Sequence, residues 1–259
     1  MLAVNQLLPA NHLLAAMSRQ AYQRMLTGLK RVKLLYGQVL YQPKGRIRYV
    51  YFPIDCLVSL LTAVDRRRIL EVGMVGNEGM VGMPKALGIG VSAVRALVQG
   101  SGTAMRMTAA HFRAEFKKNM PLQRALYRYM HLLMVQVSQT AVCNRFHSPE
   151  ARLARWLLMS DDRLRADEFL LTHKFLSKML GISTANVTKA AGVLERRKLI
   201  SYSRGNIRIL DRKGLEAAAC TCYRFVKNLQ DNAQAASSGN SPQDAKQEVR
   251  KQKQRRAAV

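Results

Sequence analysis

Acidic residues are scarce in this sequence. Its 259 residues include 16 Asp and Glu against 42 Lys and Arg, which gives a formal net charge of +26. A basic excess of this size favours a polyanionic partner, because Lys and Arg release condensed counterions when they neutralise phosphates. The composition therefore predicts a nucleic-acid-binding protein, with a ribosomal or membrane-surface protein as the alternative.

Cysteine is also rare, at four residues: Cys56, Cys143, Cys220 and Cys222. They are too few and too scattered for a disulfide framework. The pair Cys220 and Cys222 is a weak metal signal, since the sequence places no third or fourth ligand near it at zinc-like spacing. We therefore expect ordinary reduced thiols, no metal and no cofactor.

Long apolar runs are missing as well. No apolar run reaches the 18 residues that suggest a membrane span, and residues 1–10 lack the basic region and cleavage site of a signal peptide. The sequence thus predicts a cytoplasmic protein without a membrane partner.

The N-terminal half contains two different sequence patterns. Residues 5–30 show helical spacing of apolar residues, and residues 32–107 contain short β-rich runs separated by Gly and Pro. The expected strands are 38–41, 48–52, 57–63, 69–75, 96–98 and 103–107. Short strands at this spacing predict an antiparallel barrel or jelly roll. Such barrels include metal enzymes with clustered His and Glu, but no histidine lies between His12 and His111, so we expect no enzyme.

A long helix is predicted after this region. Pro121 suits a first helical position, and residues 122–144 contain no Pro, Gly or acidic residue. One apolar stripe follows helical spacing: Leu126, Met130, Leu133, Val137 and Ala141. The stripe favours a helix that links two domains and pairs with its own copy, whereas a buried core helix is the alternative.

The segment 171–210 has the pattern of a winged helix-turn-helix. Thr172 precedes a short amphipathic helix, Gly181 suits a left-handed turn, and Ser183 can cap a second helix over residues 184–197. Residues 199–210 then read as a β-hairpin with a Gly turn, which in this position is a wing.

The second helix is expected to enter the DNA major groove with its N-terminal residues. The candidates for base contacts are Thr184, Asn186, Thr188 and Lys189. Asn can bind adenine through two hydrogen bonds, and Lys can donate to guanine. The candidates for phosphate contacts are Thr172, His173, Ser183 and, in the wing, Arg204 and Arg208.

These parts together resemble the CRP/FNR family of bacterial transcription regulators over about residues 10–225. The similarity is strongest in residues 171–183, LTHKFLSKMLGIS, followed by Val187 and Leu194-Glu195. It is looser in Tyr49-Val50-Tyr51-Phe52-Pro53 and Leu57-Val58-Ser59-Leu60. The resemblance implies an α+β fold: an N-terminal β-roll sensor-like domain (1–120), a dimerisation helix (121–147) and a winged helix-turn-helix (148–226). We expect residues 227–259 to form a disordered basic tail.

The sequence departs from the effector sites of this family. Relatives that bind cyclic nucleotide carry Gly-Glu and Arg-Ser or Arg-Thr pairs, where this chain has Gly82-Met83 and Val91-Ser92. Without the guanidinium an anion pocket loses its bidentate partner. A shifted pocket of Gly82, Met83, Ser92 and Arg95 stays open, although we expect no response to cyclic nucleotide. An iron–sulfur centre lacks its cysteine cluster, since no cysteine precedes Cys56, and the five histidines are too isolated to indicate haem.

The resulting hypothesis is a homodimeric, sequence-specific regulator that binds an inverted-repeat operator in double-stranded DNA. Thr184-Ala185 and Lys189 differ from the recognition residues of cyclic-nucleotide-responsive relatives, which predicts a different operator. RNA polymerase is a further partner to consider, and the effector is unidentified. The alternative is a nucleoid-associated or RNA-binding protein whose charge gives affinity without sequence preference.

Overall fold

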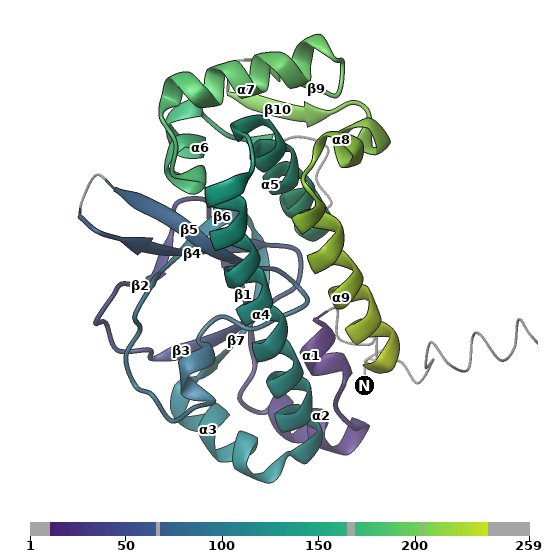
Figure 1. The fold of residues 1–259 in the computed structure, drawn as a ribbon. Helices are drawn as coiled ribbons and strands as arrows, with labels where there is room; N and C mark the ends of the chain where they lie inside the picture. The colour runs from purple at the N-terminus through teal and green to yellow at the C-terminus, as the bar shows by residue number, and fades with distance from the viewer. Residues whose placement is uncertain (1–10, 66–67, 165–168, 204, 238–259) are drawn as a thin grey trace, which may run out of the picture.

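A computed structural model of the protein describes residues 11–65, 68–164, 169–203 and 205–237 (Figure 1). The N-terminal elements are α1 (His12–Ala15), α2 (Arg19–Leu26), β1 (Lys30–Leu34), β2 (Val39–Tyr41), β3 (Tyr49–Pro53), β4 (Leu57–Ala63), β5 (Ile69–Val75), the 3-10 turn η1 (Met83–Lys85), β6 (Arg95–Gly100), β7 (Gly102–Thr108) and α3 (Ala109–Lys118). The C-terminal elements are α4 (Met120–Phe146), α5 (Pro149–Leu164), β8 (Phe169–Leu170), α6 (His173–Leu180), α7 (Thr184–Arg196), β9 (Ile200–Ser203), β10 (Asn206–Ile209), α8 (Arg212–Ala218) and α9 (Thr221–Ser237).

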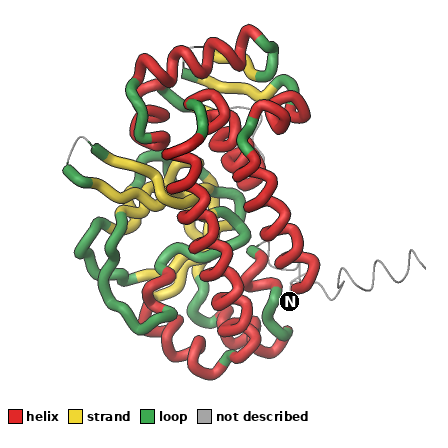
Figure 2. The backbone as a smooth tube through the Cα atoms, in the orientation of Figure 1, coloured by secondary structure: helices red, strands yellow, loops and turns green. Residues whose placement is uncertain are grey.

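The N-terminal strands form two antiparallel sheets, in the orders β1-β7-β3 and β2-β6-β4-β5. Figure 2 shows these strands gathered on one side of the long helix α4. Phe52, Val58, Val98 and Met107 from both sheets are buried in one core, which α3 and the first turns of α4 close. The predicted β-roll is therefore confirmed. Strand β1, which the helical spacing up to residue 30 concealed, pairs with β7 from Lys30 to Leu34.

The predicted N-terminal helix is two short helices in the described residues. Asn11 caps α1 by accepting hydrogen bonds from the Leu13 and Leu14 amides, and Ser18 caps α2. The Asn11 side-chain amide donates to the carbonyls of Pro53 and Gly79, both at 2.9 Å. The break between the helices therefore follows from two caps, of which the first is fixed to the β-roll.

Helix α4 links the two halves of the chain, as predicted, and the burial of its predicted apolar stripe changes along the helix from buried to exposed. Leu126 is fully buried in the β-roll core, and Leu133 lies against Gly73 of β5. Val137 of the stripe is exposed, and the helix exposes further large apolar residues: Met120, Tyr127, Met134, Val142 and Phe146. Over the described ranges, no helix combines the length and apolar character needed to cross a membrane.

Helix α5 joins the β-roll to the winged helix. Its buried side packs against α7 and α8, and it also contacts β4. Trp156 donates from Nε1 to Glu71 of β5 at 2.9 Å, and Arg163 forms a 2.9 Å ion pair with Glu78. The winged helix thus sits on the β-roll through polar as well as apolar contacts.

The chain continues as a helix beyond the winged helix. Helix α9 runs through Ser237 and lies beside α4 (Figure 1). The expectation of a disordered tail from residue 227 is therefore wrong for residues 227–237. Val226 and Tyr223 are buried on the packed side of α9, which supplies apolar contacts that the polar composition concealed. Residues 238–259 lie outside the described part of the chain.

Candidate nucleic-acid interface

The turn between α6 and α7 has the geometry of a helix-turn-helix. The Thr172 hydroxyl accepts a hydrogen bond from the Phe175 amide at 3.1 Å, and the Ser183 hydroxyl accepts one from the Asn186 amide at 3.2 Å. Gly181 ends α6 with φ +62°, a left-handed conformation that costs glycine little. Local caps and one glycine therefore set the angle between the two helices.

Helix α7 buries one side and exposes the other. Val187, Ala190, Ala191 and Leu194 are buried in the core beneath the winged helix. The predicted base-contacting residues Thr184, Asn186, Thr188 and Lys189 are all exposed on its first two turns, together with Ser183. The structure thus brings these side chains to one uncovered face, at the end of the helix where backbone N–H groups carry partial positive charge.

His173 lies inside this arrangement. Its Nδ1 is 2.9 Å from the Thr188 hydroxyl, and its ring stacks on Tyr202 of the wing with centroids 4.4 Å apart. Its Nε2 is buried, and desolvation lowers the pKa of the imidazole. Both nitrogens therefore point toward protein, so His173 joins α6, α7 and the wing in this structure.

The wing is the hairpin of β9 and β10, with β8 along its other edge. Arg208 is exposed on β10, whereas Arg204 lies outside the described residues. Glu195 of α7 accepts a hydrogen bond from the Tyr202 amide at 3.1 Å, which fixes the wing to α7.

Further basic residues flank this face, and the sequence pattern did not single them out. Lys174 and Lys178 are exposed on α6, and Arg196 and Lys198 are exposed at the end of α7. Arg197 forms a 3.0 Å ion pair with Glu150, which holds α7 against the start of α5. The overall charge was the only signal for these side chains in the sequence, and it could not place them.

The four candidate effector-pocket residues lie in the segment between β5 and the start of β6. Gly82 is buried, and its amide donates to the Tyr41 hydroxyl at 3.2 Å. Ser92 is 2% exposed, and its hydroxyl donates to the Val94 carbonyl at 2.7 Å. Met83 begins η1, and Arg95 begins β6 with a buried Nε. The Ser92 hydroxyl is therefore already used within its own turn.

A cavity of about 430 Å³ lies elsewhere, between α1, α4 and α9. Leu13, Ala125, Tyr129, Leu132 and Ala233 are among its lining residues. The cavity depends on α9, whose residues from 227 onward were expected to be disordered, so the sequence did not indicate it.

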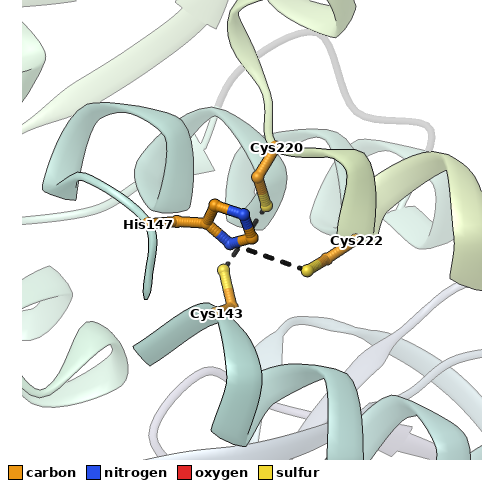
Figure 3. A group of neighbouring side chains, drawn as sticks. All are labelled: Cys143, His147, Cys220 and Cys222. Carbon is orange, nitrogen blue, oxygen red and sulfur yellow. Dashed lines mark hydrogen bonds between the residues drawn. The ribbon is translucent and has the colours of Figure 1, made fainter. Parts of the chain in front are cut away.

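The fold supplies two ligands for Cys220 and Cys222 that the sequence spacing did not offer. Cys143 and His147, at the end of α4, lie beside them (Figure 3). The Cys143 and Cys220 sulfurs are 3.4 Å apart. Their hydrogen bond lowers the pKa of Cys220, with Arg155 and His147 acting in the same direction, and raises the pKa of Cys143.

Comparison with known protein families assigns one segment of the chain. Residues 151–218 match the Crp-like helix-turn-helix domain family. A comparison with curated protein sequences gives no significant match.

Solved structures with a similar fold extend over most of the chain. The FixK2 protein of Bradyrhizobium japonicum is 13% identical with a TM-score of 0.62, and the match covers 74% of this chain and 98% of that chain. The c-di-GMP-responsive global regulator CLP of Xanthomonas campestris is 15% identical with a TM-score of 0.61, covering 74% and 99%. A CRP-family transcriptional regulator of Thermus thermophilus is 19% identical with a TM-score of 0.60, covering 73% and 96%. The chain therefore carries a Crp-like helix-turn-helix domain on the fold of the CRP/FNR regulators, as the sequence resemblance predicted.

Proposed function

We propose that the protein is a sequence-specific transcription regulator that binds double-stranded DNA as a homodimer and has no enzymatic activity. The observation that carries the proposal is the uncovered N-terminal face of α7. Its polar residues are held at a fixed angle by the Thr172 and Ser183 caps and the Gly181 turn. A recognition helix needs such a face because base edges are read by rigidly placed side chains.

Helix α4 supports the homodimer. Its exposed side carries Tyr127, Met134 and Val137, which are 53%, 62% and 39% exposed in the single chain. They are spaced by seven and three residues, which places them on one seam. Helix α9 covers a different side of α4, around Ala125, so the seam is free to meet a second copy. In a symmetric dimer formed along this seam, a twofold axis would relate the two α7 helices. The helices would then enter successive major grooves of an inverted repeat.

The exposed residues have distinct roles in the proposal. Asn186 and Lys189 contact bases, with Thr184 and Thr188 beside them. Thr172 and Ser183 contact phosphates from the helix N-termini, and Arg208 contacts the backbone from the wing. Arg204 is also proposed to contact the DNA backbone, and this proposal rests on the sequence alone. His173 positions Thr188 and Tyr202 rather than binding phosphate.

Cyclic nucleotide is not the effector in this proposal. The Ser92 hydroxyl is bonded to Val94, and Val91 is exposed where relatives carry an arginine. We expect operator affinity to be unchanged when a cyclic nucleotide is added.

The test is selection of bound duplexes from a random DNA pool at physiological ionic strength, where exposed charges are screened over about 8 Å. Full-length protein should recover a palindrome. Asn186→Ala and Lys189→Ala should each blur one position per half-site, at a cost of about 1–3 kcal/mol. Lys118→Ala, which removes an exposed lysine at the end of α3, is the matched control and should recover the original motif.

The alternative of a non-specific nucleoid or RNA-binding protein makes an opposite prediction. Affinity would then fall equally for all sequences as salt rises, and no motif would be recovered. If both variants recover the original motif, Asn186 and Lys189 do not contact bases, and the role assigned to α7 is wrong. Such a result would leave sequence-specific DNA binding by another part of the chain in place.

A further inference from the structure

Three cysteines and one histidine converge where α4 ends and α9 begins. Cys143 lies in the last turn of α4, and His147 follows that helix directly. Cys220 and Cys222 lie on either side of the first residue of α9. Figure 3 shows the four side chains pointing toward one another, and their ligand atoms all lie within 4.8 Å of each other. Two segments more than 70 residues apart in sequence thus supply one group of soft ligands.

The separations fit a single tetrahedral ion. Zinc binds thiolate at about 2.3 Å and imidazole at about 2.0–2.1 Å, which places neighbouring ligand atoms about 3.6–3.8 Å apart. The Cys143 and Cys220 sulfurs are 3.4 Å apart, and Cys222 Sγ is 3.7 Å from His147 Nδ1. A disulfide needs about 2.05 Å between sulfurs. An iron–sulfur cluster holds its cysteines further apart, because iron and sulfide atoms stand between them.

The group is enclosed by protein. Cys143, Cys220 and Cys222 are 1%, 8% and 3% exposed and form a small core of their own, apart from the two large apolar cores. Four protein ligands complete a tetrahedral site without an open position, which is the arrangement of structural rather than catalytic zinc.

Two buried arginines balance the charge of such a site. Arg152 and Arg155 of α5 are each 7% exposed, and neither forms an ion pair among the described residues. Arg155 leaves Nε without a hydrogen-bond partner, and its guanidinium acts electrostatically on both Cys220 and Glu71. Three thiolates and one histidine around Zn²⁺ carry a net charge of −1. A buried guanidinium that forms no ion pair is costly, so this anion would stabilise the arginines.

We propose that Cys143, His147, Cys220 and Cys222 bind one structural Zn²⁺ ion per chain. The ion joins the end of α4 and the turn into α5 to the start of α9. It therefore fixes α9 beside α4 and braces the segment from which the winged helix projects. The proposal concerns metal binding and stability, so it does not depend on the proposed DNA-binding function.

The test begins with metal content. Full-length protein purified under reducing conditions should contain one equivalent of zinc by mass spectrometry. Replacement by Co²⁺ should give intense visible d–d bands and thiolate-to-cobalt charge transfer, which report a tetrahedral sulfur-rich site without any variant. Cys220→Ser and Cys222→Ser should lose the zinc and weaken the charge-transfer band. Cys56→Ala is the matched control, because Cys56 is equally buried but lies in the β-roll core, and it should retain one equivalent.

Three results would overturn the proposal. One is reduced wild-type protein that stays metal-free after incubation with excess Zn²⁺. Another is a Cys222→Ser variant that still binds one zinc with an unchanged cobalt spectrum. The third is iron with acid-labile sulfide in protein purified without oxygen, which would assign the cysteines to a cluster. Chelation of the wild type should also lower the melting temperature, whereas the two serine variants should not respond to the chelator.

Discussion

Glu71 places its carboxyl group in the contact between the β-roll and α5. It is 6% exposed, and Trp156 donates to it across that contact. Burial raises the pKa of Glu71 to about 7, although hydrogen bonds from Ser59 and Trp156 and the charge of Arg155 act to lower it. A single side chain thus makes the contact sensitive to pH near neutrality.

Glu71→Gln should remove this pH dependence. The folded state binds the Glu71 proton more tightly than the unfolded chain, whose pKa lies near 4.5, so stability from this group falls as pH rises from 4.5 through 7. Over this range the free energy of unfolding falls by about 3 kcal/mol in total. Glutamine keeps a hydrogen-bond acceptor for Trp156 but carries no charge. Urea unfolding should therefore give similar stabilities for the two proteins at pH 5 and a more stable variant at pH 8. If the unfolding free energies of the wild type and Glu71→Gln change with pH in parallel, Glu71 stays ionised or stays protonated throughout this range.

Residue roles could be predicted from sequence only where they are local. Thr172, Gly181 and Ser183 act on amides within a few positions, so their spacing alone indicated the turn. His173 acts through Tyr202, which lies 29 positions along the chain and reaches it only when the wing folds back. The cysteine group depends in the same way on α9 returning to the end of α4.

Helix α4 has three sides with different surroundings. One side enters the β-roll core through Leu122 and Leu126, and another faces α9. The third side exposes Tyr127, Met134 and Val137. The predicted stripe follows one face of the helix, but the β-roll covers its first residues and leaves Val137 exposed, so the stripe combines core residues with exposed ones.

Met134→Glu should separate the proposed dimer. Met134 is 62% exposed in the single chain and lies at the middle of the seam, where a carboxylate would meet its own copy in an apolar contact. Burial of two like charges without partners costs several kcal/mol, so sedimentation or light scattering at micromolar concentration should show a monomer. Leu87→Glu is the control, because Leu87 is 54% exposed beyond η1 and far from the seam in sequence. Equal masses for both variants and the wild type would place the interface elsewhere.

Elements were predictable where their patterns were short and distinct. The expected strands 57–63 and 69–75 coincide with β4 and β5, because each is an apolar run between turn residues. Helix α9 was missed because its Gln, Asn and Ala residues resemble a linker, and its order comes from packing on α4.

The net charge of the whole molecule is +26, and part of it lies far along the chain from α7. The basic residues near the C-terminus, Arg250, Lys251, Lys253, Arg255 and Arg256, lie outside the described residues. Charges of this kind contribute affinity without sequence preference.

Truncation after Ser237 should therefore separate affinity from specificity. We expect weaker binding to random duplexes and a shallower dependence of affinity on salt, by about 0.9 in the logarithmic slope for each phosphate that the truncated chain no longer neutralises. The motif selected from a random pool should be unchanged, because α7 is intact. An unaltered salt dependence would show that residues 238–259 do not touch DNA.

The core beneath the winged helix crosses the expected domain limit at residue 148. Leu57, Leu61 and Met74 of the β-roll share it with Leu157 and Val187 of the DNA-binding half, and Leu70 touches the turn at Gly181. Melting either half would uncover apolar side chains of the other, so we expect the two to unfold as one cooperative unit. We therefore expect a core substitution in β4 or β5 to loosen the packing of α7 and to weaken binding to the proposed operator.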